Sequence, residues 1–181
     1  IFNAPKVLKN LKICNFTEVV IMKIFDAHIT PATQRFIQLK LTRNLSLSTA
    51  NKLLHSVSGI VSFFETEEDL QELKEKVFSS SNILEEPDRA EYGDFQTNED
   101  LAASVAKYLY KRIEEPDVVI EPTCGKGNFI VAALKTFRSL KKVYGIEIYR
   151  PYVWETKFSI LNFFIENSEA NKPDIFISHY N

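Results

Sequence analysis

One segment limits the possible folds of this chain more than any other. The short apolar run Asp117–Ile120 is followed directly by the glycine-containing stretch Glu121–Phe129, and helix-forming residues come next. A strand that turns sharply into a helix needs residues without a Cβ where its backbone meets a ligand, and Gly125 and Gly127 meet that need. We therefore predict a strand–loop–helix unit whose helix begins at a ligand site.

Helical and strand patterns alternate around this unit. The expected helices span 99–113, 128–139 and 151–167, and the expected strands span 118–120, 143–148 and 175–177. Such alternation is typical of a parallel sheet covered by helices, which we interpret as a Rossmann-like, doubly wound α/β fold. Only three strands fit in the chain, so the sequence predicts the first half of such a sheet.

The preceding residues carry mostly helical patterns. Apolar residues at spacings of three and four predict one helix over residues 48–64, with Gly59 inside it. Thr66 and Asp69 have the arrangement of a capping box, so a second helix is expected to begin there and to end near Ser79.

Two other N-terminal segments fit either kind of element. Glu18–Phe25 suits a buried strand or part of a helix, and Phe36–Leu41 suits a half-buried strand or a helical face. Loop composition just before residue 89 marks the expected boundary between two parts. We predict a mainly helical segment over residues 1–88 and an incomplete α/β domain over residues 89–181.

Charge is distributed unevenly along the chain. Residues 1–60 hold eight Lys and Arg against two acids, a net charge of +6, whereas the remainder holds 14 basic and 22 acidic residues, a net charge of −8. A solvated basic face explains this better than a patch that contacts phosphates, because basic and aromatic residues do not alternate there.

The chain has the composition of a cytoplasmic protein. Its two cysteines, Cys14 and Cys124, are too few for a disulfide framework, and no stretch has the pattern of a signal peptide. The longest apolar runs are a few residues long, whereas a membrane-spanning helix needs roughly 20. We expect no membrane partner.

The loop after the first strand discriminates between possible ligands. A phosphate loop would place Ser or Thr after Lys126, where Gly127 stands, and a dinucleotide loop would place a third glycine at Ile130. Glu121 at the strand end is a poor neighbour for a polyphosphate but a good one for a cation. The ammonium and sulfonium groups of S-adenosylmethionine suit this loop best.

A second acid supports the same ligand. Glu147 closes the second expected strand, where a carboxylate accepts hydrogen bonds from the two ribose hydroxyls of an adenosyl group. Cys124 lies between the two acids in sequence, but the loop has no His or Asp to activate it. We interpret it as a small buried packing residue.

Three segments resemble the N6-adenine DNA methyltransferases of restriction-modification systems. Glu121–Phe129 looks like the first motif of that family and Gly145–Ile148 like its second, while Tyr92–Ala102 resembles the segment that closes over the methionine end of the cofactor. Asn98 replaces the usual proline of that segment and suits a helix cap. The resemblance covers residues 91–181. It implies S-adenosylmethionine binding by Phe95, Thr97, Glu121, Pro122, Gly125, Gly127 and Glu147.

The resemblance also implies a reaction, methyl transfer to adenine N6 in double-stranded DNA. The family holds the flipped adenine with Asn or Asp followed by Pro-Pro and an aromatic residue, and this sequence contains no Pro-Pro. We therefore expect the N-terminal, cofactor-binding part of such an enzyme, with DNA contacts mostly outside this chain. His179 and Asn181 either contact the adenine ring of the cofactor or begin a loop, and the second interpretation is favoured.

Other functions share both motifs. A methyltransferase acting on protein glutamine or on RNA would carry the same cofactor loop and the same acid. A non-catalytic module that binds the cofactor or positions DNA through the basic N-terminal segment is an alternative of another class.

Overall fold

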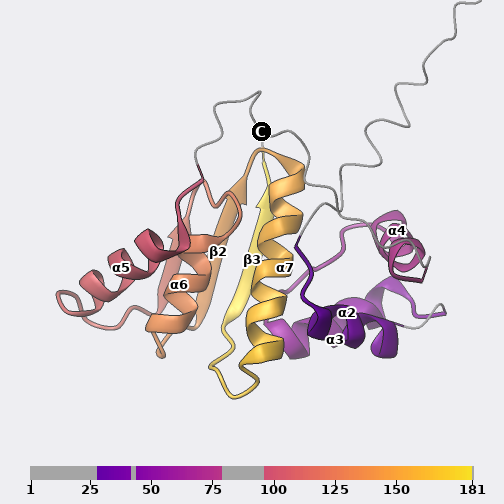
Figure 1. The fold of residues 1–181 in the computed structure, drawn as a ribbon, viewed down its shortest axis with the longest axis horizontal. Coiled ribbons are helices and arrows are strands. Elements are labelled where there is room, and N and C mark those ends of the chain that lie inside the picture. The colour runs from indigo at the N-terminus through magenta and orange to yellow at the C-terminus, as the bar shows by residue number, and fades with distance from the viewer. Residues whose placement is uncertain (1–27, 42–43, 79–95, 181) are drawn as a thin grey trace, which may run out of the picture.

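A computed structural model describes residues 28–41, 44–78 and 96–180 of the 181-residue chain (Figure 1). Several sequence predictions lie outside these ranges: the element at Glu18–Phe25, the boundary near residue 88, and the roles of Phe95 and Asn181. No helix within the described ranges is both long enough and apolar enough to cross a membrane.

Three parallel strands form the sheet, in the order β1-β2-β3. They are β1 (Val118–Glu121), β2 (Lys142–Glu147) and β3 (Asp174–His179). Tyr144 on β2 lies between Ile120 on β1 and Phe176 on β3. Because the strands run in the same direction, their carboxyl ends meet at one edge of the sheet.

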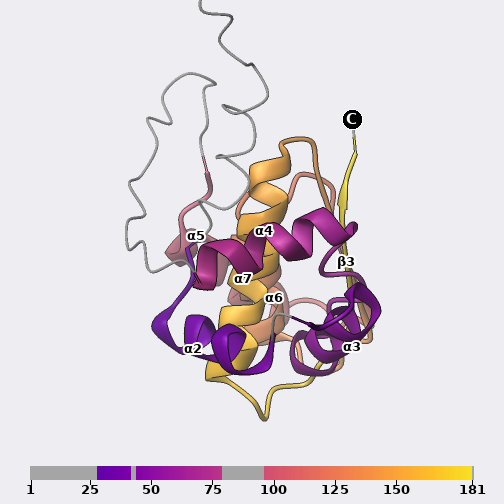
Figure 2. The ribbon, with the colours of Figure 1, turned by 90° about the vertical axis from the view of Figure 1, so that its right-hand side faces the viewer.

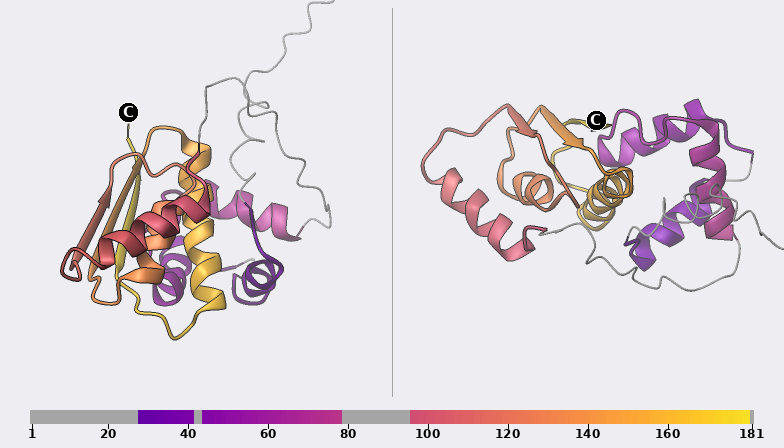
Figure 3. Two further views of the ribbon diagram at one scale, coloured as in Figure 1. Left: turned by 60° about the vertical axis from the view of Figure 1, so that its left-hand side comes forward. Right: turned by 90° about the horizontal axis from the view of Figure 1, so that it is seen from above.

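Helices α6 (Asn128–Thr136) and α7 (Arg150–Glu166) make the two crossovers between consecutive strands. Right-handed crossovers between strands in sequential order place both helices on one face of the sheet, and Figure 3 shows α6 and α7 on the same face. This confirms the parallel α/β class. No described helix covers the opposite face, so the doubly wound arrangement stays a prediction.

Helix α5 (Glu99–Tyr110) precedes the sheet and packs against α6. It begins where the sequence predicts, because the Asn98 side chain accepts a hydrogen bond from the Asp100 N–H at 2.7 Å. The helix ends at Tyr110, three residues before the expected end at Ile113.

The N-terminal part is helical wherever the structure describes it. It contains α2 (Pro31–Lys40), α3 (Leu47–Ser58) and α4 (Glu67–Phe78). The ambiguous segment 36–41 is therefore helical up to residue 40. The capping box before α4 is confirmed: the Asp69 N–H donates to Thr66 Oγ1 at 3.1 Å, and the Thr66 N–H donates to Asp69 Oδ2 at 3.1 Å.

The predicted helix over residues 48–64 is wrong in its last part, residues 59–64. It ends at Ser58 because Gly59 adopts the left-handed conformation at φ 73°. The chain then runs beside β3, where the Ile175 N–H donates to Gly59 O at 2.8 Å and the Val61 N–H donates to Ile175 O at 3.0 Å. Ile60 forms an isolated parallel bridge with Ile175. The apolar periodicity continued because Ile60 and Phe64 are buried in the core, although this segment is not helical.

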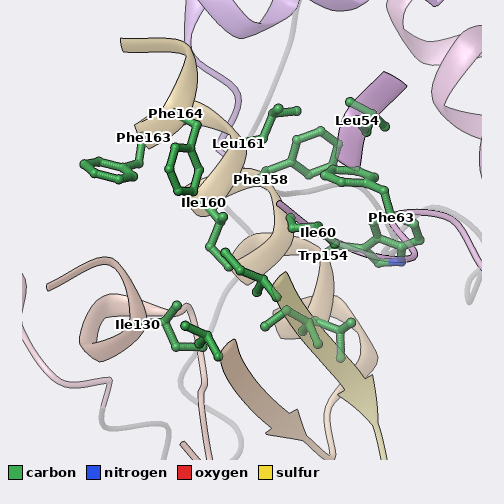
Figure 4. Packing of buried hydrophobic residues seen from close by; sticks show 14 of the residues in the cluster. Leu54, Ile60, Phe63, Ile130, Trp154, Phe158, Ile160, Leu161, Phe163 and Phe164 are labelled. Carbon is green, nitrogen blue, oxygen red and sulfur yellow. The ribbon is translucent and has the colours of Figure 1, made fainter. Parts of the chain in front are cut away.

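One hydrophobic cluster joins the N-terminal helices to the α/β part, with α7 between them. Figure 2 shows α2, α3 and α4 gathered around α7. Trp154 and Phe158 on α7 pack against Phe63, with ring centroids 6.1 Å and 5.3 Å away, whereas Ile160 points from α7 toward the sheet (Figure 4). Helix α7 is buried on nearly all sides, which is typical of a helix inside a core. The division into two domains at residue 88 stays a prediction.

Candidate functional site

A cavity of about 290 Å³ lies where β1 and β2 end. Ligands of open α/β sheets bind at this edge, beyond the carboxyl ends of the strands. The lining residues come from the segment before α5, the β1–α6 loop, the start of α6 and the end of β2. They are Gln96, Thr97, Glu121, Thr123, Cys124, Gly125, Asn128, Phe129 and Glu147.

The β1–α6 loop is held by its own backbone. The Cys124 N–H donates to Ile146 O at 2.9 Å, which ties the loop to β2, and the Gly127 N–H donates to Cys124 O at 2.7 Å. Gly125 and Gly127 have φ angles of 51° and 84°, which side chains rarely allow. Gly127 is the N-cap of α6 and has no side chain that could accept a hydrogen bond from the first N–H groups of this helix. The predicted strand–loop–helix unit is confirmed.

Neighbouring side chains occupy the space that a Cβ would need at either glycine. A Cβ on Gly125 would collide with the carboxamide of Gln96. A Cβ on Gly127 would lie 3.0 Å from Thr156 Cγ2 on α7. The two glycines therefore allow close packing on both sides of the loop as well as the required backbone angles.

The segment before α5 lies against the same loop. Gln96 Oε1 accepts a hydrogen bond from the Lys126 N–H at 3.1 Å, and Asn128 Nδ2 donates to Thr97 O at 2.7 Å. Two hydrogen bonds thus bring this segment to one end of the cavity. Residues about 30 positions apart in sequence line a single site.

Glu147 is a buried acid at the centre of the site, with 8% of its surface exposed. Its Oε2 accepts a hydrogen bond from the Gly125 N–H at 2.8 Å, and its Oε1 accepts one from the Tyr149 N–H at 2.8 Å. Backbone donors of this kind satisfy a buried carboxylate. The carboxylate that ends β2 therefore also fixes the glycine loop after β1.

Glu121 places a second carboxyl group in the cavity, from the end of β1. Partial burial raises the pKa of Glu121 above its usual value, because water solvates its charged form less well there. Lys126 is the nearest cation in sequence, but its Nζ lies 3.6 Å from Glu155 Oε2 on α7. The cavity therefore carries two acids, and a cationic ligand fits this charge.

Cys124 is a packing residue, as the sequence indicates. It is 6% exposed, and burial raises the pKa of its thiol to about 11. Its Sγ lies 3.8 Å from Thr156 Oγ1. A thiol with this pKa is almost entirely protonated near neutral pH, and is therefore a poor nucleophile.

The structure places four of the seven predicted site residues around the cavity: Thr97, Glu121, Gly125 and Glu147. Gly127 lies behind them at the start of α6, Pro122 is in the turn but does not line the cavity, and Phe95 is outside the described residues.

His179 is the last residue of β3 and does not begin a loop. One of its ring nitrogens lies 2.9 Å from Ile148 O, and it is not among the residues that line the cavity. Contact between His179 and the cofactor stays a prediction.

Sequence reasoning also missed several residues. Gln96, Thr123, Asn128 and Phe129 line the cavity, and their adjacency to predicted residues was the only signal. Thr156 touches the loop from α7 and carried no signal at all, because no motif includes it.

Comparison with known proteins identifies a relative of part of the chain. The chain is 47% identical over 72 residues to the Type II methyltransferase M.NspV of Nostoc sp.. The match covers 40% of this chain and 15% of that protein. No protein-family model and no solved structure matches the chain. The predicted resemblance to restriction-modification methyltransferases is thereby confirmed over part of the chain.

Proposed function

Because part of this chain resembles restriction-modification methyltransferases, we propose that it forms the S-adenosylmethionine-binding part of an enzyme that methylates adenine N6 in double-stranded DNA. One observation carries the proposal. The Glu147 carboxylate at the end of β2 and the glycine loop after β1 meet across one cavity, joined by the 2.8 Å hydrogen bond from the Gly125 N–H.

The groups around the cavity suit the chemistry of this cofactor. Glu147 accepts two protein hydrogen bonds, whereas a carboxylate has about four lone-pair sites, so acceptor capacity is left for ribose hydroxyls. Glu121 offers negative charge for the ammonium or the sulfonium group. Asn128 and Phe129 at the start of α6 line the cavity, and the N-terminus of a helix suits the cofactor carboxylate.

The size of the cavity agrees with a small organic ligand. Its volume of about 290 Å³ is near the lower end of the range of ligand pockets, about 300–1,000 Å³.

The bound cofactor would supply the methyl group, and the residues of this chain would bind and orient it. Orientation matters because methyl transfer requires the donor and the acceptor in line, and correct placement lowers the barrier. The sequence contains no Pro-Pro, so the family motif that holds the adenine amine is absent from it. The role that we assign to this chain is cofactor binding.

Titration calorimetry with S-adenosylmethionine tests the cofactor assignment. We expect the protein to bind S-adenosylmethionine in preference to NAD and ATP, and Glu147→Gln to weaken binding by about tenfold or more, because it removes the charged acceptor. Asp117→Asn is the matched control, an exposed acid at the opposite end of β1. Absence of binding by the unmodified protein, or equal binding by Glu147→Gln, would refute the assignment.

A transfer assay tests the acceptor. The complete gene product is incubated with S-adenosylmethionine carrying a labelled methyl group and with duplex DNA, RNA or a glutamine-containing peptide. We expect label at adenine N6 in the duplex alone. Label in RNA or in the peptide would replace adenine as the acceptor and leave the cofactor assignment intact.

A further inference from the structure

We infer that Thr156 on α7 is the positioning residue of the cofactor loop, a role that rests on the proposed function and adds a residue outside both motifs. Its side chain is completely buried, and its Oγ1 donates to Gly125 O at 2.6 Å. A threonine within a helix often bonds to a carbonyl of its own preceding turn. Here the hydroxyl reaches a loop that belongs to another crossover.

The same side chain contacts the loop at two further points. Cys124 Sγ lies 3.8 Å from Oγ1, and a Cβ on Gly127 would lie 3.0 Å from Thr156 Cγ2 and 3.3 Å from Thr156 Cα. Three loop residues thus rest on one threonine. The methyl group fixes the distance between the loop and α7, and the hydroxyl fixes the orientation of the Gly125 carbonyl.

Thr156 and Glu147 hold the two sides of Gly125 in different ways. Glu147 accepts from the Gly125 N–H at 2.8 Å, and in the proposed function it also accepts from the ribose. Glu147 thus serves both the loop and the ligand. Thr156 is completely buried and does not line the cavity, so its bond to the Gly125 carbonyl does not involve a group that also binds the ligand. We assign the loop conformation in the complex to Thr156.

A positioning role and a merely structural role predict different measurements. If Thr156 only stabilised the fold, its replacement would make the whole protein open more readily. If Thr156 positions the loop, its replacement would make the loop open more readily and leave the sheet unchanged. Amide hydrogen exchange separates the two, since it reports opening of residues 121–129 independently of β2 and α7. This measurement needs no cofactor.

The test compares Thr156→Val, which keeps the shape and removes the hydroxyl, with Thr156→Ser, which keeps the hydroxyl. Thr33→Val is the matched control, because Thr33 is also completely buried but lies in α2. We expect Thr156→Val to speed exchange in residues 121–129 by about tenfold and to weaken S-adenosylmethionine binding by about tenfold, since a buried carbonyl loses its donor. Thr156→Ser should restore most of both, and Thr33→Val should change neither.

Three outcomes overturn the inference. They are unchanged exchange in the loop of Thr156→Val, an increase of exchange in β2 and α7 as large as that in the loop, and no rescue by Thr156→Ser. If Thr156→Val does not fold, Thr156→Ala and Thr156→Ser make the same comparison. Failure of the unmodified protein to bind S-adenosylmethionine would refute the proposed function, while loop exchange would still decide whether Thr156 holds the loop.

Discussion

The two sides of α7 make contacts of different kinds. Toward the N-terminal helices, Trp154 and Phe158 pack against the Phe63 ring, and Lys157 donates to Phe63 O at 3.0 Å. Toward the site, α7 makes polar contacts: Thr156 donates a hydrogen bond to Gly125 O, and Glu155 Oε2 lies 3.6 Å from Lys126 Nζ.

This difference separates stability from ligand binding within one helix. Aromatic burial supplies most of the free energy on one side, because large apolar side chains leave water there. The other side gains less from burial but fixes the geometry of a loop beside a cavity. Substitutions on the two sides should therefore change different properties.

Phe158→Ala should have the largest effect. Phe158 is completely buried and its ring centroid lies 5.3 Å from that of Phe63. Removal of such a ring leaves a cavity and should lower the free energy of unfolding by about 3–5 kcal/mol in urea titrations. Leu39→Ala is the control, since Leu39 is 68% exposed and should lose less than about 0.5 kcal/mol. Equal losses in both variants would contradict the stabilising role of the aromatic contacts on this side of α7.

Alkylation of Cys124 tests how well the folded loop protects the Cys124 thiol from reagents in solution. With the thiol pKa raised from 9.0 to about 11, the thiolate fraction near pH 8 falls by about 100-fold. In a Cys14→Ser background, iodoacetamide should therefore react with the folded protein at least about 100-fold more slowly than with the urea-unfolded chain. Similar rates would show that the loop opens freely, contrary to the packing of Cys124 against Thr156.

Asp69→Ala should lower the stability of the protein by an intermediate amount. Asp69 Oδ1 lies 2.9 Å from Arg150 Nη2, and Asp69 Oδ2 accepts the N–H groups of Glu65 and Thr66. Loss of this buried acceptor should lower the free energy of unfolding by about 2 kcal/mol, measured by urea titration. Asp117→Asn, in an exposed pair with Lys141, should change it by less than about 0.5 kcal/mol. A loss of free energy of unfolding as small as that of the control would show that the polar contacts between α4 and α7 contribute little to stability.

The pH dependence of cofactor binding should show the smallest effect. Burial raises the pKa of Glu121, so protonation begins at higher pH than for an ordinary glutamate. The protonated carboxyl no longer attracts a cation, so S-adenosylmethionine affinity should fall by about fivefold as the pH drops through this pKa. Calorimetry at several pH values measures it, and Glu121→Gln should abolish the dependence.

The same shift has a defined sign for the free protein. The folded state binds the Glu121 proton more tightly than the unfolded state, so the contribution of this group to stability falls as the pH rises through the interval between the two pKa values. A cofactor affinity that rises on acidification would contradict the assigned role of Glu121.

Local signals predicted much of the fold. The capping box at Thr66 and Asp69, the Asn98 cap and the alternation of helices and strands are each written in neighbouring residues, and the structure contains all of them. The glycine loop was predictable for the same reason, since Gly125 and Gly127 need backbone angles that only a few residues adopt.

Features that depend on contacts distant in sequence were not predictable. Periodicity continued past Gly59 because Ile60 and Phe64 are buried, although the segment that holds them is not helical and Ile60 forms a bridge with Ile175 on β3. The role of Thr156 depends on α7 lying beside a loop formed about 30 residues earlier. Only the three-dimensional arrangement reveals such pairs.

The attachment of the N-terminal helices has a consequence for the order of folding. Asn162 Nδ2 donates to His28 O at 2.9 Å across a separation of 134 residues, and Gly59 pairs with Ile175 near the other end of the chain. Contacts this far apart must close long loops before they contribute, which slows folding. During synthesis, the apolar faces of α2 and α3 that contact α7 therefore stay uncovered until α7, which comes late in the chain, has been made.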